Sequence, residues 1–170
     1  MKLSALSKGF TFIEIFITMG ILAILAGIVF FVFNPVRGYQ VARDAERMNV
    51  VISLSEALAQ CIFDNNGKIP EAIAGMVDGA SYIIGSDTEG CEKNCSIVET
   101  QSECFDISQV RCVLEKPFVP VYISDLPIDP DTKKWSKEKI GYYISKTSGN
   151  DITLGACNPE KSIIKVLKEF

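Results

Sequence analysis

The sequence contains no histidine among its 170 residues. Histidine is the commonest general base in enzymes and the commonest side-chain ligand of transition metals, so its absence removes the residue type on which such catalysis most often depends. The sequence also lacks a Gly-x-Ser-x-Gly motif and a phosphate-binding P-loop. These absences argue against an enzyme.

Positive charge is also scarce. Lys and Arg number 17 against 21 Asp and Glu, which gives a formal net charge of -4. Removal of residues 1–9 would delete Lys2 and Lys8 and leave 15 basic side chains against the same 21 acidic ones. Because a dedicated nucleic-acid binder carries a basic surface, the sequence gives no strong nucleic-acid signal.

Long apolar runs are absent except for one, which covers residues 10–33 (FTFIEIFITMGILAILAGIVFFVF). As a helix this segment measures about 36 Å, which is enough to cross a bilayer. A cleaved secretory signal would have a shorter apolar region followed by a small-residue cleavage site, whereas Asn34-Pro35-Val36-Arg37 follows here. We therefore expect a single membrane span that stays with the protein.

One charged residue, Glu14, interrupts the apolar run. An ionised carboxylate costs about 2.5–3.5 kcal/mol at the centre of a bilayer and less near an interface. In an arbitrary single-span protein, the simplest interpretation is that such a residue lies at headgroup depth. The residues around Glu14 favour a different interpretation.

Lys8-Gly9-Phe10-Thr11-Phe12-Ile13-Glu14 resembles the processing signal of type IV prepilins. In that family a basic leader ends in Gly, Phe usually follows, and a Glu stands at the fifth position of the mature chain. The sequence matches this pattern, with Phe12 where Leu is commonest. The resemblance extends from residue 1 to about residue 62 and implies a pilin or a pseudopilin.

Cleavage after Gly9 would free an α-amine on Phe10, whose ordinary pKa of about 7.7–8.0 makes it largely cationic at neutral pH. A cation in apolar surroundings needs an anion, and Glu14 lies one helical turn away. In the family, a Glu at this position is thought to neutralise the amine of its own or a neighbouring subunit. The resemblance also implies a partner, the prepilin peptidase, an aspartyl membrane protease that cleaves after Gly9 and methylates Phe10.

The apolar helix is expected to continue beyond Pro35, which should kink or locally melt it because proline lacks a backbone donor and crowds the preceding turn. Residues 34–62 form an amphipathic pattern with apolar positions at steps of three or four. These positions are Val41, Ala45, Met48, Val51, Leu54, Leu58 and Cys61, while Arg43, Asp44, Glu46 and Arg47 are expected on other faces. Asp64-Asn65-Asn66-Gly67 then supplies turn-forming residues and a C-capping glycine.

Residues 63–170 predict a small globular head. The expected elements are a short helix near 71–77, an edge strand or loop at 116–123, strands at 141–145 and 151–155 around the turn Ser148-Gly149-Asn150, and a strand or short helix at 162–167. A turn of this kind between two β-like segments indicates a hairpin. The predicted class is α+β, with a long N-terminal helix packed on a small antiparallel sheet and with disulfide-linked loops. This is the pilin architecture that the resemblance implies.

Cysteine is missing from the first sixty residues and from the apolar run. The six cysteines are Cys61, Cys91, Cys95, Cys104, Cys112 and Cys157. An even number on the side that would be exported predicts disulfides in an oxidising compartment, although the sequence favours no particular pairing. A zinc site is disfavoured, since the spacings do not form paired Cys-x2-Cys motifs. From the cysteines we therefore expect the C-terminal part of the chain to lie on the exported side of the membrane.

Asp125-Leu126-Pro127-Ile128-Asp129-Pro130-Asp131 resembles the Leu-Pro-x-Asp-Pro element that precedes the final strands of many major pseudopilins. In pseudopilins this region helps to form a calcium site, so Asp125, Asp129, Asp131 and Asp151 are candidate oxygen ligands. The simpler alternative is a Pro-Asp turn capped by its own side chains. Because the spacing is not that of a self-sufficient calcium loop, we expect no cofactor and keep calcium as the alternative.

The predicted organisation is a leader at 1–9, a transmembrane and polymerisation helix at 10–33, its amphipathic continuation at 34–62 and a head at 63–170. The predicted function is a non-enzymatic subunit of a type IV pilus-like extracellular filament, held in the membrane before assembly. Expected partners are other pilin subunits, in a homopolymer or a mixed filament, the prepilin peptidase, a membrane assembly platform and the lipid bilayer. Two alternatives stay open: a pseudopilin of a type II secretion or DNA-uptake system, which forms a short periplasmic filament, and a single-span membrane-anchored ligand-binding protein.

The first prediction concerns processing. The mature protein should begin at Phe10 and carry a methyl group on its α-amine, because Lys8-Gly9-Phe10 matches the prepilin cleavage signal. N-terminal sequencing and intact mass spectrometry of the surface-exposed protein measure this directly. A surface pool that begins at Met1, or a cut near Asn34, would contradict it.

Overall fold

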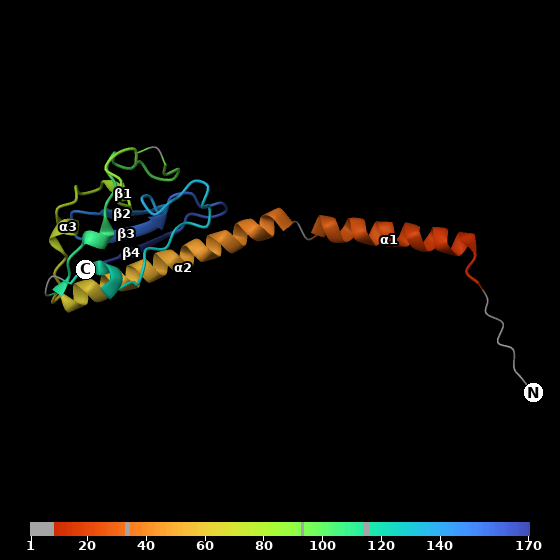
Figure 1. Ribbon diagram of the computed structural model, residues 1–170, viewed down its shortest axis with the longest axis horizontal. Helices are drawn as coiled ribbons and strands as arrows, with labels where there is room; N and C mark the ends of the chain where they lie inside the picture. Colours follow the sequence, from red (N-terminus) through yellow and green to blue (C-terminus); the bar gives the residue numbers. More distant parts are fainter. Residues whose placement is uncertain (1–8, 33–34, 93, 114–115) are drawn as a thin grey trace, which may run out of the picture. The chain divides into compact units, whose positions relative to one another are not determined.

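The computed structural model describes residues 9–32, 35–92, 94–113 and 116–170. The chain divides into two compact units, residues 1–39 and 40–170, and each is described by itself. The helical elements are α1 (Phe12–Val32), α2 (Pro35–Asp64), α3 (Glu71–Ala74), the 3-10 turn η1 (Ile107–Gln109) and α4 (Phe118–Val121) (Figure 1). The strands are β1 (Ser81–Ile83), β2 (Tyr142–Lys146), β3 (Ile152–Ala156) and β4 (Lys165–Lys168).

Helix α1 is apolar on every side, and none of its 21 residues is buried. It is long and apolar enough to cross a membrane, which agrees with the single span expected. Pro35 is the first residue of α2, a position where the missing backbone N–H removes no helical hydrogen bond. Residues 33 and 34, at which the predicted kink would fall, lie outside the described residues, so the kink stays a prediction.

The four strands form one antiparallel sheet in the order β1-β2-β3-β4. The predicted hairpin is confirmed: β2 pairs with β3 from Tyr142 opposite Ala156 to Lys146 opposite Ile152. Asn150 adopts a φ of 67° in the connecting turn, a conformation that Asn tolerates better than most residues. Of the two options for the last element, the structure has the strand, β4.

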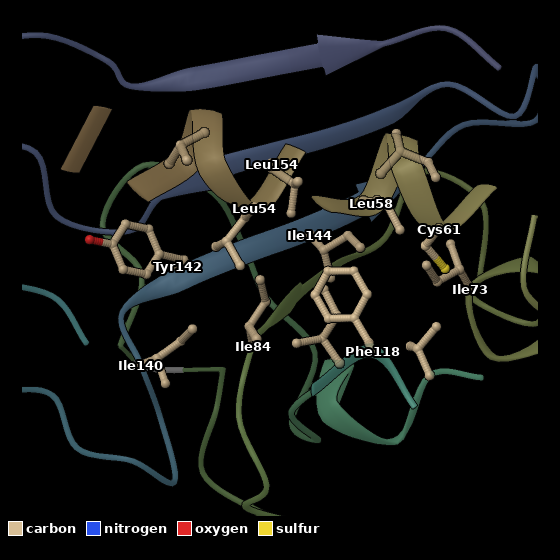
Figure 2. Close-up of a cluster of buried hydrophobic side chains, with 14 of the residues drawn as sticks. Leu54, Leu58, Cys61, Ile73, Ile84, Phe118, Ile140, Tyr142, Ile144 and Leu154 are labelled. Carbon is tan, nitrogen blue, oxygen red and sulfur yellow. The ribbon is translucent and has the colours of Figure 1, made fainter. Parts of the chain in front are cut away.

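Helix α2 packs on one face of this sheet, as predicted. Leu54 and Leu58 of α2 lie in one buried cluster with Tyr142, Ile144 and Leu154 of the sheet, and Cys61 lies at the end of this cluster beside Ile73 (Figure 2). Each of these side chains is at most 2% exposed, and burial of a side chain such as Leu or Ile contributes about 1.5–3 kcal/mol. The fold is therefore α+β, with the core between α2 and the sheet.

Helix α2 ends at Asp64, two residues beyond the predicted limit. The N–H of Gly67 donates to the carbonyl of Ile62 at 2.9 Å. Asn66 and Gly67 have φ values of 57° and 75°, which is the left-handed conformation that ends many helices. The predicted C-capping glycine is confirmed.

A second cluster of buried side chains covers the other face of the sheet. Tyr143 points away from its neighbours Tyr142 and Ile144, because successive side chains of a strand alternate between faces. It packs with Ile83 and Trp135 and with two cysteines. A Cβ atom at Gly155 would lie 2.5 Å from the Tyr143 ring, so only glycine fits beside it.

Two parts of the predicted secondary structure need correction. Residues 116–123 form neither of the two expected structures, an edge strand or a loop throughout: Phe118–Val121 is a short helical turn, in which the N–H of Tyr122 donates to the carbonyl of Phe118 at 2.9 Å. Pro117 and Pro120 lack the N–H groups that a strand would need. Strand β1 was not predicted, because it is only three residues long and lies in a glycine-rich segment.

All six cysteines are paired, so the predicted disulfides are confirmed. The bonds are Cys61–Cys112, Cys91–Cys104 and Cys95–Cys157. The first joins the end of α2 to the segment before α4, the second closes a loop after β1, and the third attaches that loop to the end of β3. Because all six cysteines form disulfides, none of them is left as a thiolate that could bind zinc.

A second prediction follows from this pairing. Quantitative thiol labelling of the unreduced native protein should find no reactive thiol. Replacement of both Cys61 and Cys112 by Ala should lower the free energy of unfolding by about 2–4 kcal/mol, because their bond closes a long loop in the unfolded chain. Replacement of both Cys91 and Cys104 is the matched comparison. It should lower the free energy of unfolding by about 1 kcal/mol less, because this bond joins cysteines separated by 13 residues instead of 51 and so closes a shorter loop. Six reactive thiols would contradict the assignment.

Candidate functional site

The part of α2 that enters the head buries charges instead of apolar side chains. Among residues 40–47, all described, Asp44 and Arg47 are the buried ones, while Val41 and Ala45 are exposed. The prediction that Val41 and Ala45 face the core and that Asp44 and Arg47 lie on other faces is therefore wrong. The physical reason is that the head presents carboxylates and backbone N–H groups to this part of α2.

Arg47 is the centre of this charged cluster and is 1% exposed. Its Nε donates to Asp129 Oδ2 at 2.7 Å and its Nη2 to Asp129 Oδ1 at 3.0 Å. Its Nη1 donates to Asp44 Oδ1 at 2.8 Å and to Glu160 Oε1 at 3.1 Å. A planar guanidinium suits this arrangement, because it can hold one carboxylate with two parallel bonds and still reach others.

Asp44 and Glu160 connect the cluster to the link between β3 and β4. The Asp44 carboxylate accepts hydrogen bonds from the backbone N–H groups of Glu160 at 3.0 Å and Lys161 at 2.7 Å. Glu160 accepts two further bonds from Arg43, at 2.6 and 2.7 Å. We call Arg43, Asp44, Arg47, Asp129 and Glu160 the arginine cluster. It joins α2, the loop before β2 and the β3–β4 connection.

Hydrogen bonding outweighs burial in setting the pKa values of Arg47, Asp44 and Glu160. Burial alone would lower the pKa of Arg47, but its bonds to Asp129 and Asp44 raise that pKa above the ordinary value. Burial alone would raise the pKa of Asp44, but the Glu160 N–H and Arg47 hold it below its ordinary value. The pKa of Glu160 is lowered chiefly by its bonds to Arg43. Arg47, Asp44 and Glu160 therefore keep their charged forms at neutral pH.

The four aspartates predicted as calcium ligands do not come together. Asp129 is fully buried and engaged by Arg47, and its Oδ1 also accepts the N–H of Asp131 at 2.8 Å. Asp125 accepts the N–H of its own neighbour Leu126, and Asp151 lies at the β2–β3 turn. Within the ranges that the structure describes, no group of three His, Cys, Asp or Glu side chains could hold a metal. The bond from the Asp131 N–H to Asp129 matches the self-capped turn, and calcium binding stays an untested alternative.

The residues predicted for processing and assembly lie at the start of α1. Gly9 and Phe10 precede the helix and are exposed, Phe10 by 80%. Glu14 is in the first turn and is exposed. Lys8 and the rest of the predicted leader fall outside the described residues.

Sequence reasoning missed the role of Thr11. Its Oγ1 accepts the N–H of Glu14 at 3.3 Å, and its carbonyl accepts the same N–H at 3.1 Å. A Thr followed three residues later by Glu is the sequence pattern of a capping box, so this N-cap was readable from the sequence. Glu14 is thus also suited to the helix start, where a negative charge is favourable.

A surface cleft of about 490 Å³ lies beside Cys112, between the α2–α3 connection and the segment before α4. It is lined by Lys68 and Arg111 but also by Glu71. These mixed charges select no one class of ligand. The cleft therefore gives the alternative of a membrane-anchored ligand-binding protein no particular support.

Comparison with known proteins gave no match, either to a family model or to a curated protein or solved structure. The fold is therefore described from its own geometry. The resemblance to prepilins continues to rest on residues 8–14 and on the apolar helix that follows them.

A third prediction tests the arginine cluster. Arg47→Met should lower the free energy of unfolding by about 3–5 kcal/mol, because it leaves the carboxylates of Asp129 and Asp44 buried without their cation. Arg43→Met is the matched control and should be much milder, since the Arg43 side chain is 42% exposed. Denaturant unfolding of the full chain in detergent measures both. An Arg47→Met variant as stable as Arg43→Met would contradict the central role of Arg47.

Proposed function

We propose that this chain is the precursor of a pilin-like filament subunit with a structural role. It is cleaved after Gly9 by a prepilin peptidase, held in the membrane by α1, and assembled through α1 into a filament that presents the head. One observation carries this proposal: a helix that exposes apolar side chains on all sides follows directly after Gly9-Phe10 and has one carboxylate, Glu14, in its first turn.

The exposed surface of α1 requires a cover. Phe31 is 91% exposed and Phe12 86%, and the other large apolar side chains of the helix are at least about half exposed. A helix that is apolar all round is normally buried in a membrane or in a protein core. The lipid bilayer covers it before assembly, and helices of neighbouring subunits cover it afterwards.

The surface of α1 also suits close contact between helices. Gly20 and Gly27 lie on α1, seven residues apart, and an added Cβ at either would meet nothing within 4 Å. Small residues at such intervals let helix backbones approach each other in apolar surroundings. This small-residue surface of α1 therefore supports the filament proposal.

Glu14 supplies the electrostatic step of assembly. Once residues 1–9 are removed, the new α-amine of Phe10 is a cation at the edge of an apolar helix and needs an anion when it is buried. Glu14 is the one acidic residue of α1. In the proposed filament it neutralises the amine of its own or a neighbouring subunit, while the membrane assembly platform delivers subunits one by one.

A pseudopilin is the second candidate. The observation that favours it is the Asp125–Asp131 segment, which resembles the pseudopilin element and precedes β2, β3 and β4. Such a subunit would use the same chemistry of α1 but would form a short periplasmic filament of a secretion or DNA-uptake system. The location of the filament, in the extracellular medium after shearing or in the periplasm, separates the two.

The fourth prediction tests the proposed function through Glu14. Glu14→Gln removes the charge but keeps the size and the capping ability, because Gln also serves at this position of a capping box. The variant should reach the membrane with a folded, disulfide-bonded head, yet its yield in filaments should fall about tenfold or more, because the amine loses its counter-ion. Western blots of membrane and sheared-filament fractions measure both pools.

Thr11→Val is the matched control. It removes the Oγ1 that accepts the Glu14 N–H but keeps the charge, so it should enter filaments at close to the wild-type level. The strain must carry no wild-type copy that could co-polymerise. Wild-type assembly of Glu14→Gln would show that charge pairing is not needed, and the absence of Glu14→Gln from the membrane would place Glu14 in insertion or in recognition by the peptidase.

A further inference from the structure

Helix α2 is attached to the head in two different ways along its length. From Val51 to Ile62 it is held by apolar side chains and by the disulfide from Cys61 to Cys112. From residue 40 to residue 47 its buried side chains are charged and belong to the arginine cluster. The two attachments respond differently to water, since carboxylates and guanidinium groups are well solvated and apolar side chains are not.

The partners of the charged attachment lie in connections of the head and not in its strands. Asp129 is in the loop before β2, and Glu160 and Lys161 are in the β3–β4 connection. The N–H groups of Glu160 and Lys161 donate to the Asp44 side chain. These two amides are therefore protected by α2 and not by the sheet.

The charged attachment is expected to open as a unit. Arg47 is bound by three carboxylates while it is buried, and loss of one partner would leave charge in apolar surroundings. Release of all the groups into water avoids that penalty. Cooperative units of this kind open with a smaller free energy than the whole domain.

We propose that the arginine cluster is a latch, which releases residues 40–47 of α2 from the head as one unit while residues 51–62 stay packed. When the latch opens, residues 40–47 of α2 leave the head while the sheet stays folded. This proposal rests on contacts within the head alone, so the experiment that tests it does not depend on whether the chain assembles into a filament.

The test is hydrogen exchange followed by NMR on the full chain in detergent micelles. Three N–H groups report on the latch: the backbone amides of Glu160 and Lys161 and the side-chain Nε–H of Arg47, which donates to Asp129. All three should open with one common equilibrium constant. Their opening should be at least about tenfold more frequent than that of the amides of β2 and β3, which open with the whole domain.

Glu160→Gln should raise the opening of the three reporters about tenfold and leave the amides of β2 and β3 unchanged, because it removes charge-assisted hydrogen bonds from the latch alone. Glu56→Gln, on an exposed position of α2, is the matched control and should change neither set. If Glu160→Gln does not fold, Arg43→Gln gives the same readout from a partly exposed position.

Two results would overturn the latch. The three reporters could open with different equilibrium constants, which would mean that the contacts break one by one. Alternatively, the reporters and the strand amides could open together in the wild type and respond equally to the variant, which would make the cluster a part of the cooperative core.

Discussion

The apolar surface of α1 is the constraint on which the rest of the structure depends. The helix exposes large apolar side chains on every side, and exposed apolar surface in water is unfavourable by about 25 cal/mol per Å². The helix therefore favours lipid or an apolar protein surface over water. The head has its own core and three disulfides, so under the proposed function it can stay folded while α1 passes from lipid to contacts with other subunits.

Within the head, α2 is attached by two kinds of interaction with different consequences. Apolar packing and a disulfide fix its second half to the sheet, and this part determines the fold. The arginine cluster holds residues 40–47 of α2 through Arg47 and Asp129, and it gives specific geometry at a cost in desolvation. A buried ion pair is weak evidence for stability in general, which is consistent with the proposed latch at residues 40–47 of α2.

The sequence was informative where the physical cause is local. The apolar run of α1, the turn between β2 and β3 and the C-capping Gly67 all depend on neighbouring residues, and each is predicted from the sequence. It was uninformative where the partner is distant: Arg47 was placed on an outer face because Asp129 lies 82 residues away in the sequence. The disulfide pairing could not be predicted for the same reason, and β1 is too short to give a periodic pattern.

The most direct test of the account is to identify what covers α1. A photo-crosslinking phenylalanine analogue at Phe31, which is 91% exposed, reports its immediate neighbours without a change in charge. The account predicts lipid adducts in the membrane fraction and adducts between copies of this chain, or with other pilin subunits, in sheared filaments. Lipid adducts alone in every fraction, with no adduct to another subunit, would contradict assembly through α1.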